Sequence, residues 1–416
     1  MGLTDPAAVG GMERLIGARR WMIVVSGALL LLVGCFVVGS ANARASSAAG
    51  SWTRVAEPQL GHGSMESIAC PSLSDCWAVG QRRVGTRDSN VMIIHWDGSS
   101  WRDTRSPAVR VGSSLQSVTC PSASDCWAVG SLDGRFNGTL IEHWNGHAWS
   151  RVPSPTPYVS GVAGDYLSGV SCESKASCWA TGGTIFFGAS GYHVIILHWT
   201  GRAWVNVPFS DHPLAILYGV SCAGPGNCWA VGNGIARLKG SRWTGVRSPA
   251  QSPVSSGKSL GAVACLSARA CLAVGTDPAR SSPSGPQYIL RWAGSRWTGI
   301  AGAQPPRFSC TPTLAHPCPQ PTPAQQSAGF GVLSGVACHQ GLGCLLVGDR
   351  GNGQPWSELW TGAKPVGILP ASAPGTYRHP AVLSAVACPT ATQCLAVGTA
   401  ETGTVGESVL FERFTL

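Results

Sequence analysis

Residues 118–130 read VTCPSASDCWAVG, and this stretch decides the fold. An apolar run ends in a cysteine, a turn rich in proline and serine follows, and a second cysteine opens another apolar run. Pairs of cysteines with five residues between them occur seven times in the 416-residue chain. The chain is therefore a repeat protein built from short strands.

The spacing of the repeats indicates the architecture. Successive first cysteines lie 50, 52, 50, 43, 73 and 50 residues apart. A period of about fifty residues made of short strands is typical of a β-propeller, in which each repeat forms one blade. We therefore expect an all-β fold, a seven-bladed β-propeller of four-stranded antiparallel blades.

The first repeat shows how one blade is built. Short strands are expected at 67–70 and 76–80, and a continuously apolar third strand, covered on both faces, at 91–96. A fourth strand follows at 101–105. Blade four is trimmed, so residues 233–239 must supply both its loop and its third strand. The tryptophans that recur in most repeats are expected to pack between neighbouring blades.

The two ends of the repeat region complement each other. The last repeat stops at Leu416, where its fourth strand should begin, whereas residues 51–58 match a fourth strand but precede the first blade. Pairing these ends closes the ring and leaves no exposed edge. We expect the N-terminal strand to complete blade seven.

The cysteine pairs are interpreted as one hairpin disulfide per blade. Zinc sites usually combine Cys-x2-Cys spacing with further ligands nearby, which the repeats lack, whereas a hairpin brings two facing cysteines together. Cys310 and Cys318 are expected to staple an insertion at 301–333, and we expect neither a metal nor a cofactor. The expected disulfide cysteines are Cys70, Cys76, Cys120, Cys126, Cys172, Cys178, Cys222, Cys228, Cys265, Cys271, Cys310, Cys318, Cys338, Cys344, Cys388 and Cys394. Such bridges require an oxidising compartment.

The N-terminus predicts export. Residues 1–20 are interpreted as a cytoplasmic n-region, 21–39 as an uncharged signal or anchor segment, 40–50 as a linker and 51–416 as the propeller. Three alternatives stay open: a membrane anchor at 21–39, secretion after cleavage near Ala43 or Ala45, and a lipidated Cys35. All three place the propeller outside the cytoplasm.

The charge pattern gives little indication of a nucleic-acid partner. The formal charge is +9, and after residue 45 the chain holds 25 basic and 18 acidic residues. Much of the excess lies on predicted fourth strands, where positive charge discourages edge-to-edge aggregation. Because the chain is exported and disulfide-bonded, we expect no nucleic-acid partner, and an anionic envelope polymer is the secondary alternative.

Catalytic motifs are scarce, and no catalytic residue is predicted. The letters Gly-x-Ser-x-Gly at 257–261 lead into a strand rather than the strand-to-helix turn that a nucleophile elbow needs. His95, His143 and His198 share one repeat position, so they are interpreted as parts of the scaffold.

A ligand site is expected where long loops converge over the central channel, on the face that carries the inter-blade loops. Loops are expected at 154–167, 182–193 and 301–333. The candidate ligand-binding residues are Tyr158, Asp165, Tyr166, Phe187, Tyr192, Asp211, His212, Tyr377 and Arg378.

The pattern from Val118 to Trp149, Cys-x5-Cys-Trp-Ala-Val-Gly followed by His-Trp-Asn-Gly-x-x-Trp, resembles exported actinobacterial β-propeller repeat proteins of unknown function. It is distantly similar to kelch, sialidase-type and photosystem-assembly-factor propellers. The sialidase Asp-box is absent, so the resemblance transfers no catalytic residue.

These features together favour an extracellular or cell-surface binding scaffold that acts as a monomer and holds an envelope glycan or a surface protein. The alternatives are a glycan-active hydrolase or lyase outside the cell and a structural component of the envelope. Two loop carboxylates facing each other across the channel would favour the hydrolase.

Overall fold

A computed structural model describes residues 50–416, except for fifteen segments. These are 57–59, 85–87, 108–111, 133–137, 156–161, 187–191, 210–215, 248, 250–257, 278–286, 304–331, 350–353, 363, 369–380 and 402–406. The expected export segments, Cys35, Cys310 and Cys318 lie outside the described residues. Within the described part, no helix is long and apolar enough to cross a membrane.

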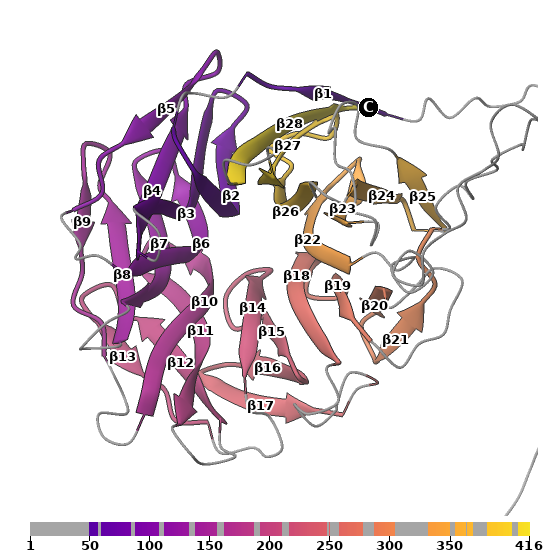
Figure 1. Ribbon diagram of the computed structural model, residues 1–416. Helices are drawn as coiled ribbons and strands as arrows, with labels where there is room; N and C mark the ends of the chain where they lie inside the picture. Colours follow the sequence, from indigo (N-terminus) through magenta and orange to yellow (C-terminus); the bar gives the residue numbers. More distant parts are fainter. Residues whose placement is uncertain are drawn as a thin grey trace, which may run out of the picture. The chain divides into compact units, whose positions relative to one another are not determined.

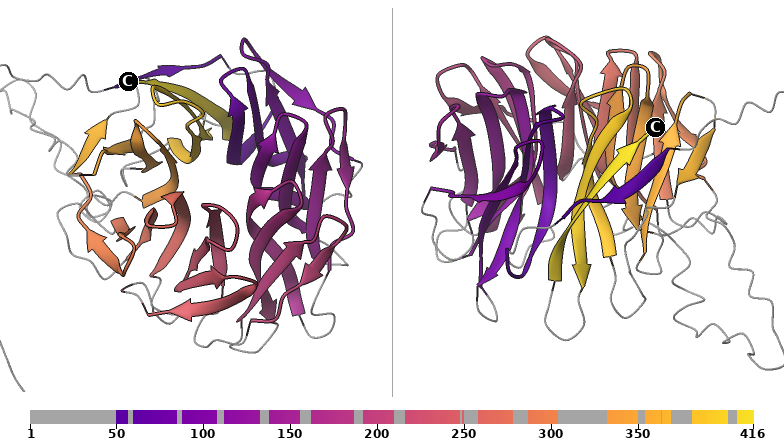
Figure 2. Two further views of the ribbon diagram at one scale, coloured as in Figure 1. Left: turned by 180° about the vertical axis from the view of Figure 1, so that it is seen from behind. Right: turned by 90° about the horizontal axis from the view of Figure 1, so that it is seen from above.

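The described strands form seven four-stranded antiparallel sheets arranged around a central axis (Figures 1 and 2). Blades one to three comprise β2 (Gly63–Ser72), β3 (Asp75–Val84), β4 (Asp88–Trp96), β5 (Trp101–Thr104); β6 (Ser113–Ser122), β7 (Asp125–Leu132), β8 (Gly138–Trp144), β9 (Trp149–Arg151); and β10 (Val162–Ser174), β11 (Ser177–Phe186), β12 (Tyr192–Trp199), β13 (Trp204–Asn206). Blades four and five comprise β14 (Leu217–Cys222), β15 (Cys228–Gly232), β16 (Ile235–Lys239), β17 (Arg242–Val246); and β18 (Ser259–Ser267), β19 (Ala270–Thr276), β20 (Gln287–Trp292), β21 (Trp297–Ile300). Blades six and seven comprise β22 (Val332–His339), β23 (Gly343–Asp349), β24 (Pro355–Trp360), β25 (Pro365–Ile368); and β26 (Ala381–Ala387), β27 (Gln393–Glu401), β28 (Glu407–Thr415), β1 (Ser51–Arg54). The seven-bladed fold expected from the repeats is confirmed, as is the trimmed fourth blade.

The ring closes as the two chain ends predict. Strand β1 pairs antiparallel with β28, and Trp52 lies opposite Phe414. The two rings are 5.3 Å apart between centroids, and the Trp52 side chain is 2% exposed. The outer strand of blade seven therefore comes from the opposite end of the repeat region to its three inner strands.

Tryptophans join neighbouring blades. Trp77 on β3 of blade one lies 4.6 Å from Trp144 and 5.3 Å from Trp149 of blade two, between ring centroids. Trp127 repeats both contacts with Trp199 and Trp204 of blade three. A large ring buried at each interface removes much apolar area from water, which confirms the structural role expected for the repeated tryptophans.

Each blade carries one disulfide between its first two strands, as expected for all seven repeat pairs. In blade three, Cys172 and Cys178 lie directly opposite each other in the ladder, with their Cα atoms 3.9 Å apart. These seven bridges indicate an oxidising location outside the cytoplasm.

The strands run further than the apolar pattern predicts. Strand β2 begins at Gly63 rather than at residue 67. A bulge after Met65 interrupts the alternation of side chains, so the sequence pattern does not show the first residues of the strand. In blade three, β10 and β11 extend to Val162 and Phe186, so parts of the expected loops at 154–167 and 182–193 are paired strand. The loops themselves are correspondingly shorter than predicted.

Candidate functional site

A cavity of about 230 Å³ lies on the axis of the propeller, lined by the innermost strands of all seven blades. Six inner strands contribute three consecutive residues each, such as Glu66, Ser67 and Ile68 from blade one, and β10 of blade three contributes Ser168 and Gly169. These residues lie near the N-terminal end of each inner strand, which follows an inter-blade loop. We call the end of the ring that carries these loops the loop face.

A bulge in each inner strand places one residue at this cavity. The ladder shifts register once between Met65 and Ser67, and an equivalent shift occurs in the other six blades. A bulge leaves one residue unpaired and re-aims its side chain. The bulge residues are Glu66, Gln116, Ser168, Tyr218, Gly261, Ser334 and Ser384, which we call the channel ring. Six of the seven carry a side chain able to form hydrogen bonds.

Small residues beside the channel ring let the inner strands approach closely. The backbone N–H of Val118 donates to Ser67 Oγ at 3.1 Å, and that of Val170 donates to Ser117 Oγ at 3.2 Å. At Gly169, an added Cβ would lie 2.8 Å from the carbonyl oxygen of Tyr218. These contacts fix the channel ring on a rigid frame.

Two of the nine candidate ligand residues lie in fully described positions, Asp165 and Tyr166, and both are on β10 rather than in a loop. Asp165 is 1% exposed, and its Oδ1 accepts a hydrogen bond from the hydroxyl of Thr184 at 2.6 Å. Tyr166 is half-buried on the same strand. The side chains of Tyr158, Phe187, Tyr192, Asp211, His212, Tyr377 and Arg378 lie outside the described part, so their role stays a prediction.

The repeated histidines belong to the blade interfaces. His95 stacks on Trp77 at 4.3 Å between centroids and donates from Nε2 to Asp75 Oδ1 at 2.8 Å. His143 repeats the arrangement with Trp127 and Asp125. The same histidine–aspartate pair in two neighbouring blades indicates a structural role for these histidines, as expected. The aspartate partners were not predicted, although each directly precedes the second cysteine of its repeat.

Blade three carries a different set of residues around its histidine. Ser177 Oγ lies 3.0 Å from Glu173 Oε2 and 3.0 Å from Nε2 of His198. Since a carboxylate only accepts, the hydroxyl proton is directed to Glu173, and His198 donates to the serine. Burial lowers the pKa of His198, while Glu173 acts in the opposite direction. In this arrangement His198 is a donor to Ser177 and does not accept its proton.

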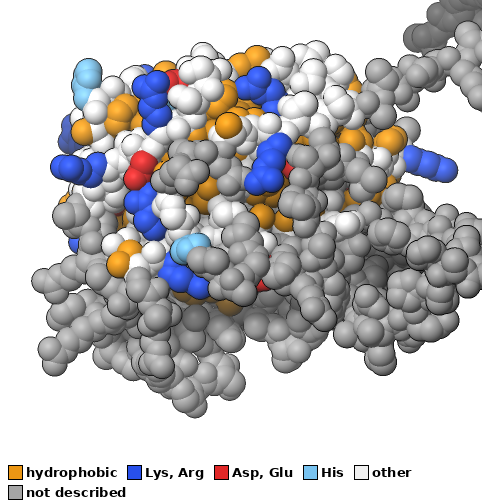
Figure 3. All heavy atoms as spheres, turned by 45° about the horizontal axis from the view of Figure 1, so that its top comes forward, with side chains coloured by type: hydrophobic (Ala, Val, Ile, Leu, Met, Phe, Trp, Pro, Cys, Tyr) orange, Lys and Arg blue, Asp and Glu red, His pale blue; other side chains and the backbone are white. Residues whose placement is uncertain are grey.

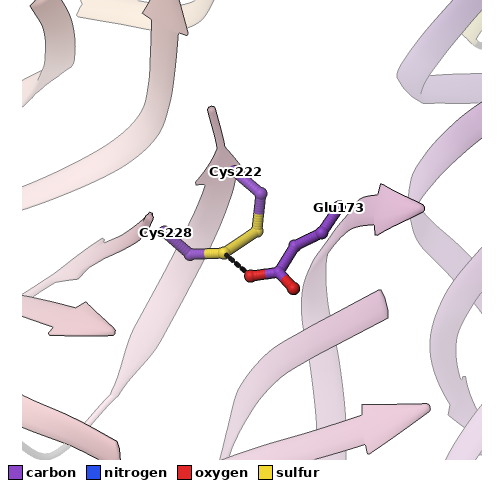
Figure 4. Close-up of side chains that lie close together, drawn as sticks. All are labelled: Glu173, Cys222 and Cys228. Carbon is purple, nitrogen blue, oxygen red and sulfur yellow. Dashed lines mark hydrogen bonds between the residues drawn. A yellow bond between two sulfur atoms is a disulfide. The ribbon is translucent and has the colours of Figure 1, made fainter. Parts of the chain in front are cut away.

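Glu173 also meets the disulfide of blade four (Figure 4). Its Oε1 accepts from the backbone N–H of Gly226 at 2.9 Å and lies 3.2 Å from Cys228 Sγ. Carboxylate and sulfur atoms at this spacing resemble a metal site, but Cys222 and Cys228 are joined in a disulfide. Metals bind thiolates, so in the oxidised protein this group is a bridge between blades three and four.

Three buried glutamates occupy one position of the third strand, Glu142, Glu358 and Glu412, where blades one and three have Ile94 and Leu197. Burial raises the pKa of Glu142 to about 7, although a hydrogen bond from Ser106 at 2.8 Å acts against it. Burial also raises the pKa of Glu412 to about 7, against the charge of Arg54. In the sequence these residues stand out only as a glutamate inside an apolar run, such as Glu142 in residues 139–144.

Comparisons with known proteins show similarity in fold alone. No protein-family model and no curated protein sequence matches the chain. The propeller YCF48, solved with a D1 peptide bound, superposes with a TM-score of 0.52 at 12% identity, over 88% of this chain and 97% of that one. The WD40 propeller of Doa1 gives a TM-score of 0.53 at 10% identity, over 88% and 97% of the chains. The Hadza microbial sialidase Hz136 gives 0.47 at 11% identity, over 88% of this chain and 68% of its own.

Proposed function

We propose that the protein is a binding scaffold outside the cytoplasm, which holds an envelope glycan or a surface protein on its loop face, at the mouth of the axial channel. The channel ring is the observation that carries this proposal. Six polar side chains from six different blades converge there, among them Glu66, Gln116 and Tyr218. A few polar groups placed on rigid strands provide the orientation and specificity that a binding site needs.

The rest of the fold supports recognition on a rigid support. Each blade is stapled by a disulfide, and the ring is closed by β1, so the seven inner strands keep fixed positions. The propeller YCF48 is described with a D1 peptide bound, and it shares this fold at 12% identity. Propellers of this type therefore can serve as binding scaffolds, and the ligand of this chain has to follow from its own residues.

The described part of the channel favours binding over glycoside hydrolysis. Glycosidases place two carboxyl groups on either side of the bond they cleave. Among the described residues that line the axial cavity, Glu66 is the one carboxylate. Asp165, the other described candidate acid on the loop face, is buried against Thr184.

The proposal is tested by probing arrays of envelope glycans and surface proteins with the purified protein and with a Glu66→Ala/Tyr218→Ala variant. We expect binding by the wild type and at least about tenfold weaker binding by the variant, since two of the hydrogen-bonding groups are removed. Arg202→Ala, in an exposed turn of blade three, is the matched control and should bind as the wild type does. Equal binding by both variants, or turnover of a bound glycan, would contradict the proposal.

A further inference from the structure

The excess of positive charge comes from two blades. Residues 216–303, which span blades four and five, contain nine Lys and Arg residues and one acidic residue, Asp277. Of the 25 basic and 18 acidic residues after position 45, the remaining 16 and 17 nearly balance. On the face drawn in Figure 3, which is turned toward blades seven and one, Lys and Arg side chains occur in separate groups, and several of these groups have an Asp or Glu side chain beside them. A local excess of one sign is thus a property of blades four and five.

Four of these cations line one cavity. It has a volume of about 370 Å³ and lies on the outer flank between blades four and five, bounded by β16, β17 and the turn before β21. Its charged residues are Arg237, Lys239, Arg247 and Arg296, and its tryptophans are Trp229, Trp292 and Trp297. We call it the flank cleft. No acidic side chain is among the described residues that line it.

Arg237 stands where blades one to three have a histidine. It lies opposite Trp229, as His95 lies opposite Trp77. Its guanidinium carbon is 5.0 Å from the Trp229 ring centroid and 5.4 Å from that of Trp292. The stacking on two rings holds this cation in place.

The partner that neutralises the equivalent position in blade one is missing in blade four. His95 is paired with Asp75, whereas the residue before the second cysteine of blade four is Asn227, whose side chain donates to the Pro225 carbonyl. The Nε atom of Arg237 is buried without a hydrogen-bond partner in the described part of the chain. A buried donor without a partner costs free energy, so the charge of Arg237 lacks the compensation that Asp75 gives His95 in blade one.

The other cations of the cleft also lack an acidic partner among the described residues. None of the four forms an ion pair with a described acidic residue, whereas Arg82 and Arg102 of blade one are each 2.8 Å from an aspartate. Lys239, Arg247 and Arg296 are exposed. Like charges that share one cleft repel each other, and a ligand of opposite charge would remove this repulsion.

We propose that the flank cleft binds the phosphate or carboxylate groups of an anionic polymer. Arginine presents a planar fork of donors that matches either oxyanion in a bidentate way, and several cations in one cleft favour a ligand with repeated charges. The tryptophans of the cleft are 1–4% exposed, so they form its floor and leave the recognition to the cations. This site is on the outer flank, apart from the axial channel, and it does not depend on the proposed function.

The test measures affinity for inorganic polyphosphate, polygalacturonate, uncharged dextran and single-stranded DNA by titration calorimetry at low salt. The variants are Lys239→Glu and Arg296→Glu, which change exposed side chains and leave the Arg237 stack intact. Arg202→Glu is the matched control, because Arg202 lies in the corresponding exposed turn of blade three. This substitution changes the net charge by the same amount as each cleft variant.

We expect binding to polyphosphate or polygalacturonate, and the stronger of the two identifies the oxyanion. Each cleft variant should weaken it by about tenfold or more, the control by less than about twofold, and added salt should reduce wild-type binding. Equal weakening by all three variants would show a general charge effect and overturn the proposal. Binding to neither polymer, or to DNA alone, would overturn it as well.

Discussion

The indole nitrogen of Trp52 donates a hydrogen bond to Ser357 Oγ at 2.9 Å, between residues 305 positions apart in the chain. Ser357 in turn donates to the carbonyl of Ile368 on β25 at 2.7 Å. Trp52 thus belongs to blade seven by backbone pairing and to the core of the interface with blade six by its side chain. The first described strand both completes the last blade and fastens it to its neighbour.

Removal of this strand should destabilise the whole ring. Deletion of residues 51–58 leaves the outer edge of β28 unpaired and strips Trp52 from its interface, at a cost of about 3 kcal/mol or more. We expect aggregation or a clearly lower melting temperature in thermal denaturation, and a smaller decrease for Trp52→Ala. Thr53→Ala, at an exposed position of the same strand, is the control. A truncated chain that stays monomeric with unchanged melting would show that closure does not depend on this segment.

Each hairpin disulfide should contribute modestly and independently. Replacing both Cys120 and Cys126 by serine removes a short loop constraint worth about 2 kcal/mol in the chain-entropy account. We expect melting a few degrees lower, with the fold retained by the other bridges. Peptide mapping without reduction should find every repeat pair joined internally, and Cys310 joined to Cys318. Free thiols in the repeats would contradict the assignment.

The buried glutamates should make stability depend on pH. Since burial raises the pKa of Glu142 from 4.5 to about 7, the folded protein retains a proton that the unfolded chain has lost between these values. The free energy of unfolding should therefore decrease as the pH rises through this window, by about 3 kcal/mol at most for this residue, and level off above it. Glu412, whose pKa is also raised to about 7, adds to the same trend.

The measurement compares denaturant unfolding at about pH 5 and about pH 8. In Glu142→Gln the difference between the two should shrink, because a neutral amide replaces the titrating group. Glu401→Gln, at an exposed position, should leave the difference as in the wild type. If Glu142→Gln and the wild type lose the same free energy of unfolding between the two pH values, the carboxyl group of Glu142 does not retain its proton in the folded state.

Glu173 should stabilise the interface between blades three and four without a metal. Glu173→Ala leaves the N–H of Gly226 and the hydroxyl of Ser177 without their acceptor, at a cost of about 1–3 kcal/mol. Glu401→Ala is the control for loss of an exposed carboxylate. Zinc should not raise the melting temperature of the oxidised protein, and a rise that Glu173→Ala abolishes would show that a metal binds there.

The repeat spacing was sufficient to predict the architecture, because strand length, turn chemistry and paired cysteines all recur with one period. Even the exchange of the end strands followed from a match between residues 51–58 and 100–107. The channel ring was not predicted. A bulge such as that at Glu66 adds one residue and reverses which face the next side chains occupy, so alternation alone does not show which residues face the axis.

The flank cleft could be predicted only in part. The run from 216 to 303 with a single acidic residue is visible in the sequence. That Arg237 replaces a histidine, and that Asn227 replaces its aspartate, becomes meaningful only once the ladder places these positions side by side. Six of the other candidate residues lie in undescribed segments, and Tyr192 opens β12 with its side chain undescribed. Their roles depend on side-chain positions that repeat patterns do not specify, since loops differ in length and composition from blade to blade.

The most direct test of the proposed function is site-specific photo-crosslinking from the channel ring. A photoreactive amino acid is placed at Gln116 in one protein and at Arg202, on an exposed turn, in another, and both are irradiated with isolated cell envelopes. We expect position 116 to give one defined adduct, a glycan or a surface protein identified by mass spectrometry, which position 202 does not give. Identical adducts from both positions, or none from position 116, would contradict a ligand site at the axial channel.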